Sequence, residues 1–159
     1  MRRALVLLPL LLAGSSQTAV PAALPEALRA HVKDERLQVV TSIRGLPLGV
    51  RDSLAGLFGT YPVDMAEPTG EFQLAAGRSQ LPTRRLVKAG CSVDHCLVYY
   101  ERGGDAHTWH VLLFHWTPDE TRIECGGIAP AGLASIDDVR AAVLSGAIKG
   151  PVKVWRPLL

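Results

Sequence analysis

The chain has 159 residues, of which 48% are hydrophobic and 20% charged, and its formal net charge is +2 at pH 7. A chain of this length and apolar content can bury the core of one globular domain unaided. Its charge is too small to produce the positive field on which non-specific nucleic-acid binding depends, so the composition excludes a general nucleic-acid-binding protein.

The N-terminus has the pattern of a secretory signal peptide. Arg2 and Arg3 are followed by an apolar run over residues 4–13 and then by small and polar residues. This run is too short to cross a bilayer as a permanent helix. Removing the segment also removes two basic residues and no acidic one, so the remaining chain has a formal charge of zero.

The processing site and the destination follow from the same segment. Ser15 stands where a lipoprotein signal requires a cysteine, so we expect no lipid anchor. Cleavage after Ser15, Ala19 or Ala22 gives a signal peptide over residues 1–22 and one globular domain over residues 23–159. We therefore expect a periplasmic or secreted protein with no stable membrane insertion after cleavage. A retained membrane anchor is the alternative.

The next part of the chain predicts two helices and a strand. Apolar residues recur at helical spacing in residues 24–35 and 47–58, and each segment has a proline near its start. Residues 37–44 are rich in β-branched side chains and predict a strand. Residues 60–83 contain several prolines and glycines, which predicts an irregular connection with one short strand at 71–74.

A four-stranded antiparallel meander is predicted over residues 84–127. Its first two strands cover residues 84–90 and 96–102. A two-glycine turn at residues 103–104 and a turn fixed by Pro118 connect the apolar, aromatic-rich runs that follow. Consecutive strands joined by such short turns pair as neighbours in one sheet.

The C-terminal part predicts a helix and a last strand. Ser135 can cap a helix over residues 136–145, with Asp138 as its capping-box partner. Residues 152–155 then favour a strand. The predicted fold class is α+β, with a four- to five-stranded antiparallel meander sheet and two to three helices packed on one face.

The three cysteines are expected to form one disulfide. Cys91 and Cys96 flank the short loop of a predicted hairpin and face each other across it, within the separation that a disulfide requires. Cys125 lies two strands from Cys96, which is too far for a bridge, so we expect it to be free and buried. A zinc site is the rival interpretation. The chain lacks a second cysteine pair and histidines at ligand spacing, so we expect no metal and no cofactor.

One candidate binding site follows from the predicted strand register. The turn at residues 103–104 sets Tyr100 opposite His107, and the Cys91/Cys96 hairpin sets Arg85 beside Arg102. These four side chains then share the polar end of an apolar sheet face. Arginine forks beside an aromatic wall suit a small anionic ligand. The alternative is a set of solvated side chains at a hairpin tip.

The histidines do not predict a metal site. His107, His110 and His115 lie in one predicted strand, in which alternation puts His110 on the opposite face. His107 and His115 are then about 26 Å apart along the strand. His31 and His95 belong to other elements, so the sequence does not bring them together.

No motif in the chain specifies a reaction. We therefore expect a non-catalytic binding or accessory protein of the bacterial envelope. Its partner is unknown, with a small anionic ligand or an envelope protein as the candidates. The alternative is a small thiol-dependent hydrolase in which Cys125 acts with His110 or His115 as its base.

Overall fold

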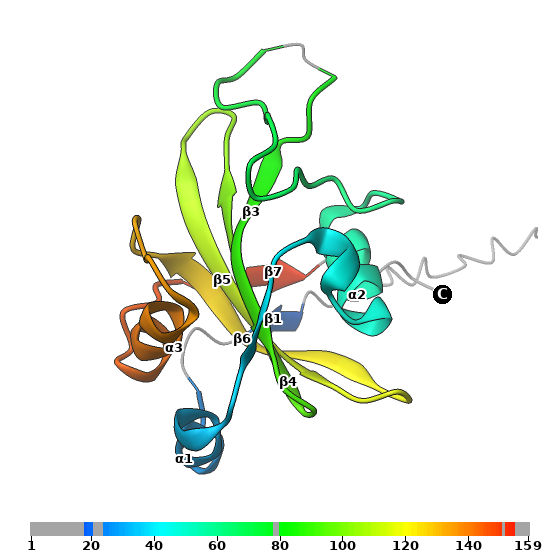
Figure 1. The fold of residues 1–159 in the computed structure, drawn as a ribbon. Coiled ribbons are helices and arrows are strands. Elements are labelled where there is room, and N and C mark those ends of the chain that lie inside the picture. Colours follow the sequence, from blue (N-terminus) through cyan, green and yellow to red (C-terminus); the bar gives the residue numbers. More distant parts are fainter. Residues whose placement is uncertain (1–17, 21–23, 78–79, 151, 155–159) are drawn as a thin grey trace, which may run out of the picture.

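A five-stranded antiparallel sheet forms the centre of the computed structural model, which describes residues 18–20, 24–77, 80–150 and 152–154 (Figure 1). Four consecutive strands form the meander that the sequence predicts, and a fifth strand, β2, pairs with its β3 edge. The fold class is therefore confirmed. The strands of this sheet are β2 (Gln38–Val40), β3 (Arg84–Cys91), β4 (His95–Arg102), β5 (Thr108–Trp116) and β6 (Thr121–Ala129).

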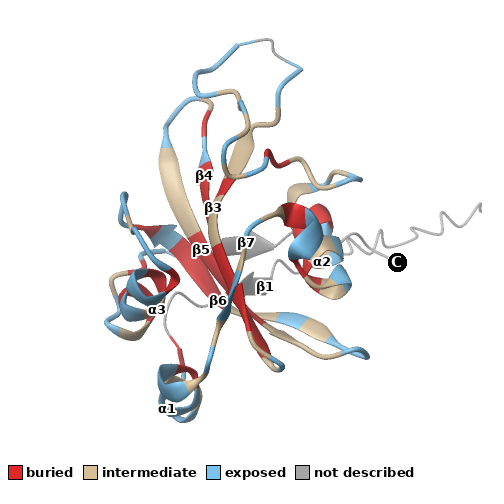
Figure 2. Cartoon of the chain, viewed as in Figure 1, coloured by how far each residue is buried: buried red, intermediate tan, exposed pale blue. Residues whose placement is uncertain are grey.

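The helices cover both faces of the sheet, and the expectation that they share one face is wrong (Figures 1 and 2). Helices α1 (Glu26–Asp34) and α3 (Ile136–Leu144) pack on one face, and α2 (Leu48–Phe58) packs on the other. The reason lies in β4, where every residue from His95 to Tyr100 is buried. A strand that is apolar on both faces needs cover on both faces.

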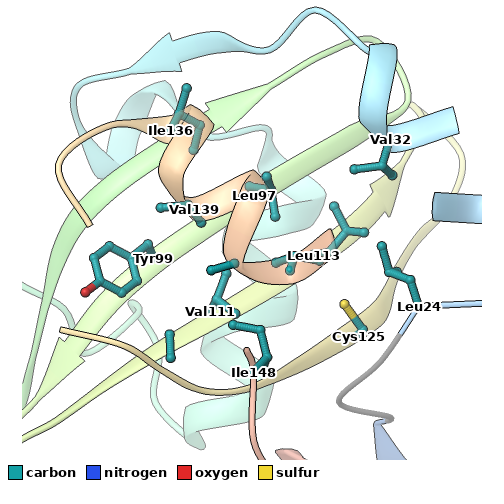
Figure 3. Close-up of a cluster of buried hydrophobic side chains, with 13 residues drawn as sticks. Leu24, Val32, Leu97, Tyr99, Val111, Leu113, Cys125, Ile136, Val139 and Ile148 are labelled. Atoms are coloured by element: carbon teal, nitrogen blue, oxygen red, sulfur yellow. The ribbon is translucent and has the colours of Figure 1, made fainter. Parts of the chain in front are cut away.

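The core on the α1/α3 face combines aliphatic side chains from the helices and the central strands (Figure 3). Val139 of α3 packs over Leu97 and Val111 of the sheet, and all three are fully buried. Tyr99 is equally buried, and its hydroxyl donates a hydrogen bond of 2.8 Å to the carbonyl oxygen of Pro130. The core on the α2 face includes Leu54 of that helix.

The helix ends follow the predicted signals. The Ser135 hydroxyl accepts a hydrogen bond from the Asp138 backbone N–H, and the Asp138 carboxylate accepts one from the Ser135 N–H, which confirms the capping box of α3. Pro25 and Pro47 directly precede α1 and α2. Gly59 ends α2 with a positive φ of 68°, a conformation that glycine adopts without strain.

The connection over residues 60–83 does not form the strand predicted at 71–74, whose residues are all described. Two isolated bridges hold it, from Ala66 to Arg85 and from Ala75 to Gly104. A Cβ on Gly103 would lie 2.0 Å from the carbonyl oxygen of Gln73, so only glycine permits this approach. The strand predicted over residues 37–44 is shorter in the structure, where β2 is followed by a 3-10 helix, η1 (Ile43–Gly45).

A second, two-stranded sheet joins the two ends of the described chain. Strand β1 (Thr18–Val20) pairs antiparallel with β7 (Val152–Val154), which corresponds to the predicted last strand. Strand β1 lies within the predicted signal peptide, whose other residues are outside the described ones, so cleavage stays a prediction. Within the part of the chain that the structure describes, no helix has both the length and the apolar character needed to span a bilayer.

The cysteines are arranged as predicted. Cys91 and Cys96 are direct partners across β3 and β4 and lie at disulfide distance, with their Cα atoms 4.0 Å apart. Cys125 is free and buried.

Replacing both Cys91 and Cys96 with alanine is expected to lower the free energy of unfolding by about 2 to 3 kcal/mol at most, because the loop that the bridge closes is short. Urea unfolding followed by tryptophan fluorescence measures this loss, since the Trp116 indole N–H donates to the Ser92 carbonyl in this loop at 3.2 Å. Mass mapping under non-reducing conditions is the control. Finding Cys96 joined to Cys125 would contradict the pairing.

Candidate anion-binding pocket

The register between β4 and β5 differs from the predicted one by three residues. Tyr100 pairs with His110, and Arg102 pairs with Thr108, so the connection spans residues 103–107 instead of two glycines alone. An odd shift of register exchanges the two faces of a strand. His107 is therefore not opposite Tyr100. His110 occupies the position opposite Tyr100 that was predicted for His107.

The register between β3 and β4 is also shifted, here by one residue. An irregularity between Leu86 and Lys88 places Arg84 opposite Arg102 and Arg85 opposite Glu101. The prediction that Arg85 lies beside Arg102 on the paired strand is therefore wrong. A bulge of this kind leaves one extra residue unpaired and turns the following side chains to the other face.

The four predicted ligand-binding residues consequently fall into two groups. Arg85 and His107 both contact Glu101: the Arg85 Nε donates to its Oε1 at 2.6 Å, and the His107 Nε2 lies 2.8 Å from its Oε2. Glu101 is only 5% exposed. The Arg85 guanidinium also stacks over Phe72, 4.6 Å from the ring centroid, and so attaches the 60–83 connection to the sheet. Arg85 and His107 thus both have partners within the protein.

Tyr100 and Arg102 belong to a pocket of about 280 Å³ on the α2 face. Three basic residues, Arg84, Arg102 and Lys149, line it. The rest of its wall is largely aromatic and aliphatic, and comprises Leu57, Phe58, Tyr100, His110, Gly127, Ile128 and Gly150. The pocket therefore combines concentrated positive charge with a flat aromatic wall.

The two arginines of this pocket differ in how they are held. Arg84 donates to the Asp64 carboxylate at 3.1 Å, and its guanidinium lies 3.9 Å from the Phe58 ring centroid. Arg102 is exposed and has no acidic partner at ion-pair distance among the described residues. Like charges directly opposite each other on paired strands are unfavourable, and an anion between them relieves the repulsion.

Two uncharged rings, those of Tyr100 and His110, also line the pocket. The Tyr100 and His110 rings stack with centroids 5.2 Å apart, and the Thr108 hydroxyl lies 2.8 Å from His110 Nε2. Burial lowers the pKa of His110, and the charges of Arg102 and Arg84 act in the same direction, so that together they bring it to about 4. Burial raises the pKa of Tyr100 to about 12. At neutral pH the positive charge of the pocket therefore comes from its arginines and lysine.

The lowered pKa of His110 predicts a loss of stability in acid. Between pH 6.5 and about 4 the unfolded chain holds a proton on His110 that the folded protein does not bind. Its contribution to stability is thus fully present above pH 6.5 and is lost as the pH falls toward 4. Denaturant unfolding at several pH values should show a steeper decline for the parent protein than for His110→Gln. An NMR titration of His110 near pH 6.5 would contradict this.

Cys125 has the environment of a core residue. It is fully buried, and burial raises the pKa of its thiol to about 12, with the neighbouring Glu124 charge acting in the same direction. No hydrogen bond joins it to a histidine among the described residues. The thiol hydrolase that the sequence left open therefore stays a prediction, which the reactivity of the Cys125 thiol tests.

Sequence reasoning missed Arg84, His110 and Lys149. The two register shifts put Arg84 and His110 at the positions that were predicted for Arg85 and His107. The sequence Arg84-Arg85 was the available signal, because it offers two arginines for one position in the pocket. Lys149 reaches the pocket through an isolated bridge between its backbone and that of Ile128, which no local pattern indicates.

Comparison of the chain with family models, with curated proteins and with solved structures finds no match in any of the three.

Proposed function

We propose that this protein is an exported, non-catalytic binding protein of the bacterial envelope that holds a small anionic ligand in the pocket on the α2 face. The observation that carries the proposal is the pairing of Arg84 with Arg102 across β3 and β4, with Arg102 lacking an acidic partner among the described residues. Arginine presents a planar fork that matches a carboxylate or phosphate group.

The rest of the pocket narrows the ligand class. A volume of about 280 Å³ lies below the usual range for drug-sized ligands, so the ligand is small. The stacked rings of Tyr100 and His110 offer a flat surface beside the arginines. Small carboxylates, phosphate esters and acidic sugars combine a charged group with a body that fits this surface.

Two features support the location. The N-terminal segment has the charge and length pattern of a secretory signal. Cys91 and Cys96 lie at disulfide distance, and disulfides persist in oxidising compartments such as the periplasm.

A thermal-stability screen tests the proposal. The protein is heated with inorganic phosphate, small carboxylates, phosphate esters and acidic sugars, each against sodium chloride at equal ionic strength. A ligand of the pocket raises the melting temperature in proportion to the logarithm of its concentration, because it binds the folded state alone. It also raises the pKa of His110, because its charge offsets that of the two arginines. If no anion does better than chloride, the proposal fails.

A further inference from the structure

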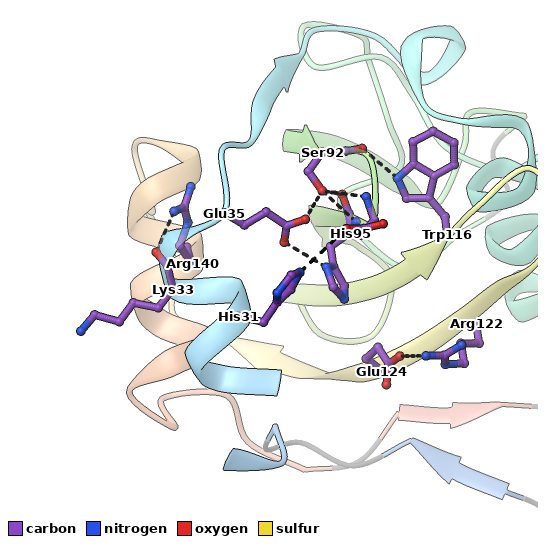
Figure 4. Close-up of polar contacts among 10 residues, drawn as sticks. His31, Lys33, Glu35, Ser92, His95, Trp116, Arg122, Glu124 and Arg140 are labelled. Carbon is purple, nitrogen blue, oxygen red and sulfur yellow. Dashed lines mark hydrogen bonds and ion pairs between the residues drawn. The ribbon is translucent and has the colours of Figure 1, made fainter. Parts of the chain in front are cut away.

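A second cluster of polar side chains lies where α1 meets the hairpin between β3 and β4 (Figure 4). His31 is on α1, Glu35 caps the C-terminus of that helix, and His95 begins β4. One ligand atom from each of these side chains lies within 4.8 Å of the others. Residues 60 positions apart in sequence thus point toward one another.

Two of the three side chains are held in place from several directions. His95 is 4% exposed, and its Nδ1 lies 2.9 Å from Glu35 Oε2. The Ser92 hydroxyl donates to the other Glu35 oxygen and accepts the backbone N–H groups of Asp94 and His95, at 3.1 and 2.9 Å. Hydrogen bonds of this kind orient metal ligands in proteins.

The third side chain faces solvent. His31 is 55% exposed and packs edge-on against His95, with ring centroids 5.3 Å apart. Its Nε2 is 3.9 Å from Asp94 Oδ2, which is too far for a hydrogen bond. His31, Glu35 and Asp94 line a pocket of about 660 Å³, so the cluster is reached from outside.

We propose that His31, Glu35 and His95 bind a divalent transition metal, with Zn²⁺ as the preferred ion and the fourth position open toward the pocket. Two imidazole nitrogens and one carboxylate oxygen form a donor set that suits zinc, whereas Mg²⁺ and Ca²⁺ prefer oxygen ligands alone. In binding, the metal takes the place of the proton that lies between Glu35 and His95.

The required adjustment is small. Metal–ligand bonds of about 2.0 to 2.1 Å set tetrahedral ligand atoms about 3.3 Å apart, so an apo cluster within 4.8 Å must contract. His31 is the mobile member because it is exposed on a short helix, while Glu35 and His95 are fixed. A water molecule from the pocket then occupies the fourth position.

Metal titration of the tag-free protein after treatment with a chelator tests the proposal. Co²⁺ serves as the spectroscopic probe, because tetrahedral Co²⁺ absorbs strongly in the visible range. We expect this band to saturate at one ion per chain and to disappear when Zn²⁺ is added. Calorimetry with Zn²⁺ gives the affinity.

The informative variant is His31→Ala, since an exposed side chain can be removed without unfolding the core. Because loss of a group that only orients a ligand already weakens metal binding about tenfold to a hundredfold, loss of the ligand His31 should weaken Zn²⁺ binding by at least about a hundredfold and abolish the Co²⁺ band. The matched control His107→Gln should change neither. Circular dichroism confirms that each variant is folded. No Co²⁺ band in the parent protein, or equal Zn²⁺ affinity in His31→Ala, would overturn the proposal. Arg102→Ala should leave metal binding intact, which separates this site from the anion pocket.

Discussion

Arg102→Ala is expected to weaken binding of a small anion about tenfold to a hundredfold. A hydrogen bond to a charged group contributes about 1.5 to 3 kcal/mol, and 1.4 kcal/mol corresponds to a factor of ten in the dissociation constant. Arg102 is the better choice than Arg84, because Arg84 also pairs with Asp64 and its loss would disturb the fold. Calorimetric titration of the best anion from the stability screen measures the effect.

Two control variants distinguish the contribution of the planar Arg102 guanidinium from that of positive charge alone. Arg122→Ala removes one positive charge from an exposed arginine of β6 that already pairs with Glu120 and Glu124, and it should bind the anion as the parent does. Arg102→Lys keeps the charge but loses the planar fork, so its affinity should fall between those of the parent and Arg102→Ala. Equal affinity in the parent and Arg102→Ala would show that the anion binds elsewhere.

Most helices and strands of this fold were predictable because they have local signals, whereas β1 and η1 were not predicted. The capping box of Ser135 and Asp138 and the prolines before α1 and α2 act within a few residues. The hairpin closed by Cys91 and Cys96 was predictable for the same reason, since its loop is short and its ends must meet. Spacing and turn chemistry are properties of such short segments.

The register at the glycine turn was not predictable. Gly103 and Gly104 are typical of a two-residue turn, yet the connection extends to His107 because the 60–83 segment packs against Gly103. The shift at Val87 likewise has no signature in the sequence. A slip of one or three residues moves a side chain to the other face, and so Arg84 and His110 occupy the pocket instead of Arg85 and His107.

The His31/Glu35/His95 cluster illustrates a different limit. His31 and Glu35 are four positions apart, which puts them on one side of a helix. The sequence therefore indicates that these two residues are close together. The position of His95 beside them depends on the end of α1 meeting the hairpin loop that carries Ser92 and His95. That contact is set by packing across the α1/α3 face, which local patterns do not describe.

Cys125 is expected to react with a thiol reagent about a thousandfold more slowly in the folded protein than an ordinary cysteine at neutral pH. Only the thiolate is nucleophilic, and burial raises the pKa of Cys125 from 9.0 to about 12, which reduces the thiolate fraction about a thousandfold. The rate of labelling by a maleimide, measured by mass spectrometry, checks this.

The control for Cys125 is the same reaction in denaturant without reductant, where the Cys91–Cys96 bridge persists and Cys125 is the one thiol available. Labelling there should proceed at the rate of a free cysteine. Slow labelling in the folded state would mean that Cys125 acts as a small apolar side chain beside Leu113 and Val111, and that the α1/α3 face is a packed core. Fast labelling of the folded protein would instead mean an accessible thiolate, which would contradict the buried-cysteine prediction and favour the thiol-hydrolase alternative.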